Sequence, residues 1–255
     1  MKFNQVKALV TGGASGLGLS VAQRIVNAGG KVCLLDINDQ AGPNIAQELG
    51  NDSCYIHTDV TSEAAVLRAV DESLEAHGGL NLVVNCAGVI GAGRVLGREA
   101  PMELSFFTHT IMINLVGSFN VAKAAADRMQ HNEPSEDGER GVIINTASVA
   151  AFEGQIGQAA YSASKGGIVG MTLPMAREFA RIGVRVMTIA PGIFWTPMVD
   201  NMPEHVQESL SASVLFPRRL GKPEEYAATI EHIVENVYLN GCTIRLDGAV
   251  RLAPK

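Results

Sequence analysis

The sequence predicts an α/β fold in which one domain contains a doubly wound parallel sheet of about seven strands. Short β-branched segments alternate along the chain with longer segments of helical periodicity, as in repeated strand–helix–strand units. Several of the short segments are apolar on both faces, which is typical of parallel strands covered by helices on each side. The 255 residues, 47% of them hydrophobic, are enough for one large core.

The expected elements follow in order along the chain. Strands are predicted over 7–11, 31–36, 54–59, 82–86, 142–146, 184–189 and 243–247. Helices are predicted over 16–28, 40–49, 62–77, 102–130, 159–182 and 223–236. Ligands of such sheets bind at the carboxyl ends of the strands, near the point where the strand order reverses.

Two segments interrupt the alternation. Residues 131–140 are polar and are predicted to form an exposed loop. Residues 193–222 contain Trp195, several prolines and a short helical pattern near 204–213; long connections in compact domains are usually functional, so we expect a substrate lid there. The single domain would have a cofactor half, roughly 1–130, and a catalytic and substrate half, roughly 131–255.

Charge and hydropathy argue against several classes of partner. The net charge is −6 and no basic tract occurs, so no nucleic-acid partner is expected. No run of 18 apolar residues predicts a membrane span. The first residues resemble neither a signal peptide nor a transit peptide, so a cytoplasmic location is expected, or the mitochondrial matrix if the source is eukaryotic.

The four cysteines show no metal-binding spacing. None belongs to a C-x-x-C pair and no histidine cluster accompanies them, so no metal is expected. Cys33, Cys54 and Cys86 lie in apolar strand segments and are interpreted as small buried hydrophobic residues. This interpretation implies a reducing compartment.

The first predicted strand leads into the segment TGGASGLG at 11–18 and then into a helix. Gly12 permits a tight turn, Gly16 lets the backbone approach a pyrophosphate, and Gly18 lets the helix pack closely on the sheet. Ser15 and Leu17 complete the loop. The free N–H groups and the dipole of the helix N-terminus favour phosphate, so this segment predicts a Rossmann-type dinucleotide site.

Asp36 ends the second predicted strand and indicates which dinucleotide binds. Its carboxylate can accept both hydrogen bonds from the adenosine ribose and would repel a 2′-phosphate. Ile37 and Ser15 provide no cation for that phosphate. We therefore expect NAD as the cofactor.

The ends of the next two strands would complete the cofactor site. Asp59 and Val60 end the third strand, where the adenine ring is expected. Cys86, Ala87 and Gly88 end the fourth strand, and their small size lets the backbone pass close to the cofactor.

Three side chains predict acid/base chemistry. Tyr161 and Lys165 are spaced i, i+4 on a predicted helix and so share one face, and Ser148 follows the fifth strand. A phenol has an ordinary pKa of about 10, and a neighbouring ammonium is expected to lower that pKa by roughly one to three units. Tyr161 could then exchange a proton near physiological pH while Ser148 holds the substrate oxygen.

These motifs together resemble the short-chain dehydrogenase/reductase family over the whole chain. The matching residues are TGGASGLG at 11–18, Asp59 and Val60, NCAG at 85–88, Asn114, Ser148, YSASK at 161–165, and Pro191 and Gly192. The resemblance implies that Tyr161 is the acid/base, that Lys165 activates it and anchors the ribose, and that Ser148 binds the substrate oxygen. It further implies that Asn114 holds a water of the proton relay and that Pro191, Gly192, Phe194 and Thr196 contact the cofactor.

Within this family, three segments are similar to the type-2 3-hydroxyacyl-CoA dehydrogenases. They are 132–178, which includes the acidic loop, 185–198 and 244–252. This likeness implies NAD, a homotetramer, and oxidation of a hydroxyl β to a CoA thioester. Gln155 and the lid would then wall the substrate pocket, with Phe194, Trp195 and Met198 as an apolar face and with Arg218, Arg219 and Lys222 near the CoA phosphates.

Three functional hypotheses stay open at this point. The first is an NAD-dependent dehydrogenase of short or 2-methyl-branched 3-hydroxyacyl-CoA thioesters. The second is a dehydrogenase of steroids or other secondary alcohols, and the third is a non-catalytic dinucleotide-binding scaffold, which would have no need of Ser148, Tyr161 and Lys165. A tetramer is also expected because the helices at 102–130 and 159–182 carry apolar residues beyond the needs of one sheet face: Ile111, Val121, Ile168, Met171 and Met175.

Overall fold

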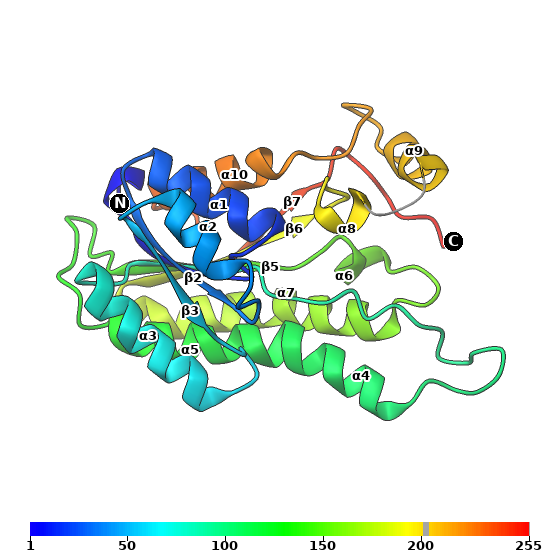
Figure 1. The fold of residues 1–255 in the computed structure, drawn as a ribbon, viewed down its shortest axis with the longest axis horizontal. Helices are drawn as coiled ribbons and strands as arrows, with labels where there is room; N and C mark the ends of the chain where they lie inside the picture. Colours follow the sequence, from blue (N-terminus) through cyan, green and yellow to red (C-terminus); the bar gives the residue numbers. More distant parts are fainter. Residues whose placement is uncertain (201–203, 255) are drawn as a thin grey trace.

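The computed structural model describes residues 1–200 and 204–254 and contains a seven-stranded, wholly parallel sheet (Figure 1). The strand order β3-β2-β1-β4-β5-β6-β7 confirms the predicted doubly wound α/β fold. The strands are β1 Lys7–Thr11, β2 Lys31–Asp36, β3 Ser53–His57, β4 Leu82–Asn85, β5 Gly141–Thr146, β6 Val184–Pro191 and β7 Thr243–Leu246. The helices are α1 Gly16–Asn27, α2 Gly42–Leu49, α3 Glu63–His77, α4 Leu104–Ile111, α5 Gly117–Met129, α6 Ala150–Glu153, α7 Ala159–Phe179, α8 Pro197–Asp200, α9 Glu204–Ser213 and α10 Pro223–Glu235.

Helices cover both faces of the sheet, with α1, α2 and α10 on one side and α3, α5 and α7 on the other (Figure 1). Successive strand residues alternate between the two cores: Val32 and Leu34 of β2 face the first layer, and Cys33 and Leu35 face the second. Because both faces of the central strands β1, β4, β5 and β6 are buried, most of their residues are apolar, whereas the edge strands β3 and β7 are half-buried. The long connection after β6 contains α8 and α9 before it returns to α10.

The strands end close to the predicted positions, with small differences that have local causes. Strand β3 stops at His57 rather than at Asp59. The Asp59 carboxylate accepts hydrogen bonds from the backbone N–H and the hydroxyl of Thr61, and this turn takes the chain away from the sheet. Strand β6 continues beyond Ile189 to Pro191, because β7 pairs with it as far as Leu246.

The helix expected over 102–130 begins at Leu104 and is interrupted by a π-helical turn, Met112–Val116. By length and composition alone, Leu104–Met129 is the one described helix that is apolar enough to cross a membrane. Its inward face, including Val121, Ala125 and Met129, packs on the sheet. A core helix of a soluble domain passes the same test, so the absence of a membrane span stays a prediction.

The prediction that the acidic segment 131–140 is an exposed loop is only partly correct. Glu139 is buried, and its carboxylate pairs with the buried guanidinium of Arg185 at 2.7 Å. The same carboxylate accepts a hydrogen bond from the ammonium of Met1 at 2.9 Å. Arg185 also donates to backbone carbonyls near the end of α10, including those of Ile233 and Val234. The segment therefore joins the start of the chain to β6 and α10.

The expectation of free thiols in the strands is wrong for two cysteines. Cys33 and Cys54 form a disulfide between β2 and β3, whereas Cys86 and Cys242 are free. The sequence does not predict this disulfide because each cysteine lies in its own apolar strand, and only the parallel register places them opposite one another.

Candidate active site

The sheet reverses its strand order between β1 and β4, and the loops that follow these two strands face each other there. Gly12 has a φ of +62°, and a Cβ atom at this position would lie 2.9 Å from the backbone nitrogen of Ala87. A Cβ on Gly18 would lie 2.3 Å from the carbonyl oxygen of Gly12. Both positions therefore require glycine, and α1 begins at Gly16 with Ser15 as its N-cap. This geometry fits the pyrophosphate of a dinucleotide at the start of α1.

Asp36 lies at the end of β2, beside this loop. One carboxylate oxygen accepts a hydrogen bond from the backbone N–H of Ala14, and the other accepts one from that of Asn38, each at 3.1 Å. Ile37, the next residue, is 67% exposed. The half-buried carboxylate of Asp36 is therefore fixed at the edge of the glycine loop, where a ribose diol could reach it.

The residues after β4 are also tied to the loop. The hydroxyl of Thr11 accepts hydrogen bonds from the backbone N–H groups of Cys86 and Ala87, each at 3.1 Å. A Cβ on Gly88 would lie 3.1 Å from Asn114 Oδ1 and 3.5 Å from Lys165 Nζ. The chain at Gly88 therefore passes close to two of the predicted catalytic residues. The role of Thr11 in holding this segment was not predicted.

The third strand contributes less directly. Val60 is buried, and its carbonyl oxygen accepts a hydrogen bond from the Asn120 amide at 3.0 Å. Asp59 lies beyond the strand in the turn described above. Both residues follow the end of β3, at the edge of the sheet where the adenine was expected.

Asn114 is fully buried within the π-helical turn. Its side chain accepts a hydrogen bond from the N–H of Val89 at 2.8 Å and donates to the Val89 carbonyl at 2.9 Å. It also donates to the Ser164 hydroxyl at 3.0 Å. Such π-helical turns are frequently found at functional sites, and here the turn brings Asn114 against the segment that follows β4.

Ser148 follows β5, and Tyr161 lies in the first turn of α7. The Ser148 side chain lies near enough to the Tyr161 phenol to affect its pKa. Burial raises the pKa of the Tyr161 phenol above its ordinary value, and the polar side chain of Ser148 acts in the opposite direction. The lowered pKa expected from the sequence is therefore not what this structure has, since the burial of the phenol outweighs the effect of its neighbours.

Lys165 lies one helical turn beyond Tyr161. Its Nζ is 5.8 Å from the centre of the Tyr161 ring and donates a hydrogen bond to the Thr146 carbonyl at 2.8 Å. Burial lowers the pKa of the Lys165 ammonium from 10.5 to about 8, against the opposing effect of Cys86. The lysine can therefore change its charge close to physiological pH, a property typical of catalytic lysines.

The sequence did not predict a cluster of polar side chains around Thr146, whose carbonyl accepts the hydrogen bond from Lys165. The hydroxyl of Tyr226, from α10, lies 2.7 Å from that of Thr146. The Cys86 sulfur lies 3.6 Å from the Thr146 hydroxyl and 3.8 Å from the Tyr226 hydroxyl. Tyr226 is fully buried, and its ring meets that of Phe194 edge-on at 6.4 Å between centres. A polar residue that interrupts the apolar face of α10 was the available signal.

The remaining predicted cofactor contacts lie at the end of β6 and on the segment that follows it. A Cβ on Gly192 would lie 2.9 Å from the Cα of Asp247, so the chain passes close to the end of β7 there. Phe194 is buried and forms an isolated β-bridge with Gly221. The carbonyl of Thr196 accepts hydrogen bonds from the backbone N–H groups of Val199 and Asp200 in α8. Pro191, the last residue of β6, is buried. These residues leave the carboxyl end of the sheet on the same side as Ser148.

Some of the residues predicted to wall the substrate pocket instead contact other parts of the chain. Gln155 is half-buried, and its amide donates to the carbonyl of Ala253. Trp195 is 42% exposed. The side chain of Met198 lies outside the described residues, as does 201–203 within the lid. Arg219 forms a two-pronged ion pair with Glu225, so it is committed to the start of α10 rather than free for phosphate.

Comparison with known proteins identifies the family. Residues 6–207 match the family model described as short chain dehydrogenase. The chain belongs to the short-chain dehydrogenase family. It is therefore an oxidoreductase acting on CH–OH groups, and the scaffold hypothesis is wrong.

Several proteins that are similar to this chain share one name. The 3-hydroxyacyl-CoA dehydrogenase type-2 of Bos taurus is 52% identical over 97% of this chain and 95% of its own. The protein of the same name from Drosophila melanogaster is 50% identical over 97% and 98%. A crystal structure of 3-hydroxyacyl-CoA dehydrogenase type-2 from Mycobacterium avium matches with a TM-score of 0.95 at 40% identity, over 99% of this chain and 98% of that one.

Proposed function

We propose that this family member catalyses the reversible, NAD-dependent oxidation of short-chain or 2-methyl-branched 3-hydroxyacyl-CoA thioesters to 3-oxoacyl-CoA. The observation that carries the proposal is the buried phenol of Tyr161 with the Ser148 side chain and the buried Lys165 ammonium beside it. The two relatives described above, at 50% identity or more over nearly the whole chain, carry that activity in their names.

The residues at the reversal of the strand order fit a dinucleotide. The positions at Gly12 and Gly18 leave no room for a side chain, and Asp36 lies beside them with both carboxylate oxygens on backbone N–H groups. The nicotinamide of bound NAD supplies the hydride acceptor. The charge of Asp36 and the lack of a cation at Ile37 favour NAD over NADP, since a 2′-phosphate would meet a like charge.

The catalytic side chains divide the work of proton transfer. Ser148 would donate a hydrogen bond to the substrate oxygen and so hold the substrate beside Tyr161. Tyr161 takes the hydroxyl proton during oxidation, and the Lys165 ammonium stabilises the phenolate that this step needs. Asn114, which is fixed between Val89 and Ser164, would hold the water that passes this proton toward solvent.

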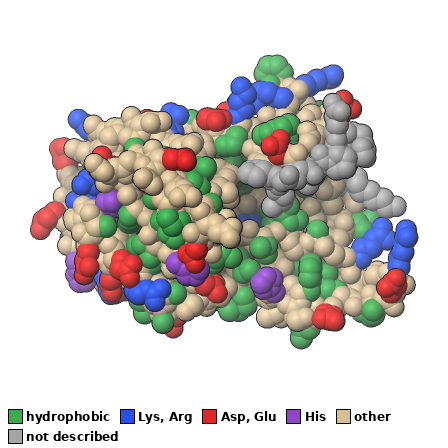
Figure 2. Space-filling view, viewed as in Figure 1, with side chains coloured by type: hydrophobic (Ala, Val, Ile, Leu, Met, Phe, Trp, Pro, Cys, Tyr) green, Lys and Arg blue, Asp and Glu red, His purple; other side chains and the backbone are tan. Residues whose placement is uncertain are grey.

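The substrate would enter beside the lid. Trp195, which is 42% exposed, provides apolar surface for a small alkyl group, whereas Phe194 is buried against Tyr226. Gln155 lies on the segment between Ser148 and Tyr161. Figure 2 shows Lys and Arg side chains along the upper edge and at the right end of this face. Arg218 and Lys222 are exposed before α10, and Arg94 is exposed beside a hollow that Ile156 also lines. These exposed cations would meet the CoA phosphates.

A homotetramer remains part of the proposal, but different residues support it. Val121, Ile168 and Met175 are buried within their own chain, so they cannot form an interface as expected. The α4–α7 apolar surface, which we define as the exposed side chains of Leu104, Phe106, Phe119 and Leu173, lies on the helical layer of α4, α5 and α7 (Figure 1). Exposed apolar surface of this kind favours burial against a second copy. Cytoplasm, or the matrix of a eukaryotic mitochondrion, is the location that we propose.

One assay separates the proposed function from the remaining alternative. Purified protein is supplied with acetoacetyl-CoA and NADH, and in parallel with NAD and a panel of hydroxysteroids and simple secondary alcohols. The proposal expects rapid NADH consumption with acetoacetyl-CoA. No consumption with the thioester, together with efficient oxidation of a steroid or simple alcohol, would assign the protein to the second hypothesis and leave the catalytic residues unchanged.

A further inference from the structure

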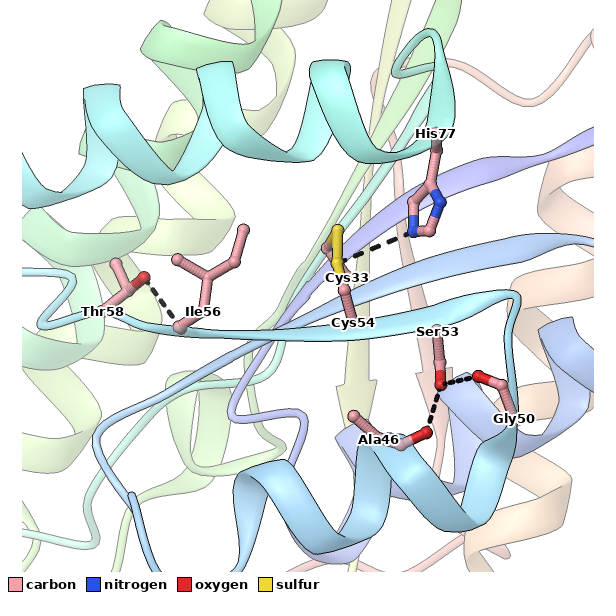
Figure 3. Close-up of a disulfide and its surroundings, with 8 residues drawn as sticks. All are labelled: Cys33, Ala46, Gly50, Ser53, Cys54, Ile56, Thr58 and His77. Carbon is pink, nitrogen blue, oxygen red and sulfur yellow. Dashed lines mark hydrogen bonds between the residues drawn. A yellow bond between two sulfur atoms is a disulfide. The ribbon is translucent and has the colours of Figure 1, made fainter.

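The disulfide between Cys33 and Cys54 lies away from the dehydrogenase site, under the C-terminal end of α3 (Figure 3). The two cysteines are direct partners in the parallel register of β2 and β3, with their Cα atoms 4.7 Å apart. This separation lies in the range that disulfides require. The strand pairing alone therefore holds the two sulfurs within bonding reach, and no backbone movement is needed to join them.

The two sulfurs differ in how easily a reagent could reach them. Cys33 is fully buried on the inner strand β2. Cys54 is half-buried on β3, which is the edge strand of the sheet. An attacking molecule from solvent would therefore meet Cys54 first, and Cys33 could react only with its neighbour.

A histidine faces the more accessible sulfur. His77, the last residue of α3, has its Nε2 atom 3.7 Å from Cys54 Sγ (Figure 3). Burial lowers the pKa of His77 below its ordinary value, and hydrogen bonds with the backbone of Val32 and Ala76 act in the opposite direction. A neutral imidazole at this distance can take the proton of a thiol and leave a thiolate, which is the reactive form of cysteine.

We propose that Cys33, Cys54 and His77 form a redox-active thiol site that reacts with hydroperoxides and is separate from the dehydrogenase chemistry. In this site Cys54 attacks the hydroperoxide, Cys33 then forms the disulfide with Cys54, and His77 accepts the proton of the Cys54 thiol. The three ligand atoms lie within 4.8 Å of one another, as they would around a metal ion. The sulfurs are bonded to each other here, however, so the structure favours redox chemistry over metal ligation.

The chemistry balances in two steps. The Cys54 thiolate attacks one oxygen of the hydroperoxide, the O–O bond breaks, and the leaving oxygen takes the proton held by His77, which leaves a sulfenic acid on Cys54. The sulfur of Cys33 then attacks Cys54 Sγ, the S–O bond breaks, and water leaves with the Cys33 proton. Two thiols are oxidised and one hydroperoxide is reduced. A small dithiol reverses the change by attacking Cys54 and releasing Cys33.

The expected consequence is a change in stability. The disulfide joins two residues that are 21 positions apart in the sequence, and the loop between them includes Asp36 and α2. Closing a loop of this length restricts the unfolded chain. The oxidised protein should therefore unfold at a temperature several degrees higher than the reduced protein. Turnover should change little, because β2 and β3 are already paired along their length.

The test follows thiol oxidation in the reduced full-length protein. Fully reduced protein is mixed with hydrogen peroxide, and samples are alkylated and mapped by mass spectrometry. We expect a loss of two hydrogens that maps to Cys33 and Cys54, well before oxidation of the exposed Cys242. Oxidation of Cys242 first, or at the same rate, would overturn the proposal.

Variants assign the three roles. His77→Asn should slow disulfide formation about tenfold or more, whereas the matched change His131→Asn at an exposed histidine should not alter it. Cys33→Ala should leave a sulfenic acid on Cys54 that a dimedone probe traps, and Cys54→Ala should give no adduct on Cys33. Wild-type rates in His77→Asn, or a dimedone adduct on Cys33 in Cys54→Ala, would contradict the assignment even if one of the other variants failed to fold.

Discussion

The Tyr226 hydroxyl lies 2.7 Å from the Thr146 hydroxyl and connects α10 to the end of β5 directly behind the catalytic lysine. The carbonyl of the same threonine accepts the hydrogen bond from Lys165 Nζ. Tyr226→Phe keeps the buried ring but leaves the Thr146 hydroxyl without this partner. We expect the free energy of unfolding to fall by about 1–2 kcal/mol in urea titrations, with a few-fold lower kcat. Tyr238→Phe, at a side chain that is 96% exposed, is the matched control and should change neither.

Tyr161→Phe separates the acid/base role from cofactor binding. The ring and its packing remain, while the transferable proton is lost. We expect kcat to fall by about 10² to 10⁴-fold, the usual contribution of a positioned acid or base. NADH binding, followed by fluorescence, should stay at the wild-type value. A variant that kept a tenth of the wild-type rate would show that another group transfers the proton.

Lys165→Met tests the cost of burying an ammonium. The pKa of Lys165 is about 8 in the folded protein and 10.5 when exposed, so between these pH values the unfolded chain binds the proton and the folded protein does not. The free energy of unfolding of the cofactor-free wild type should therefore rise with pH across this window relative to the variant, by about 3 kcal/mol at most. Urea titrations from pH 7 to 10.5 measure this difference.

The same lysine substitution should have opposite effects on stability and turnover. At pH 7 the buried charge is absent from Lys165→Met, so the variant should be the more stable protein and almost inactive. Lys2→Met, at an exposed lysine, provides the control. Identical pH dependence in wild type and Lys165→Met would mean that the ammonium is not desolvated as the structure indicates.

The preference for NAD should depend on the charge of Asp36. Wild-type protein should favour NAD over NADP by about a hundredfold or more in kcat/KM, because a phosphate opposite a carboxylate costs several kcal/mol. Asp36→Asn keeps an oxygen acceptor beside Ala14 and removes the charge, so the gap between the cofactors should narrow. Asp39→Asn, an exposed neighbour, should leave it unchanged. Equal efficiency with both cofactors in the wild type would refute the role of Asp36.

Local signals account for most of what the sequence predicted. The glycines at 12, 16 and 18, the carboxylate at Asp36 and the spacing of Tyr161 and Lys165 each depend on a few neighbouring residues. The parallel sheet followed from apolar strands that alternate with helices. These features repeat a backbone requirement or a helical period, so one stretch of chain is enough to reveal them.

The contacts that were missed join distant parts of the chain. Thr146 and Tyr226 are 80 positions apart, and Glu139 and Arg185 are 46 apart. Cys33 meets Cys54 only because β2 and β3 pair in one particular register. A buried polar residue in an apolar segment indicates that a partner exists, but the tertiary fold decides which residue that partner is.

Assembly should depend on the α4–α7 apolar surface. Phe119 is 47% exposed on α5, and Phe119→Asp would place a charge where the proposed interface is apolar. Light scattering at micromolar concentration should give a tetramer for the wild type and a smaller species for Phe119→Asp. Leu67→Asp, on the neighbouring helix α3 with 38% exposure, is the matched control and should stay tetrameric. A monomeric wild type would remove assembly from the proposal, because the exposed residues of this surface would then face solvent in the working protein.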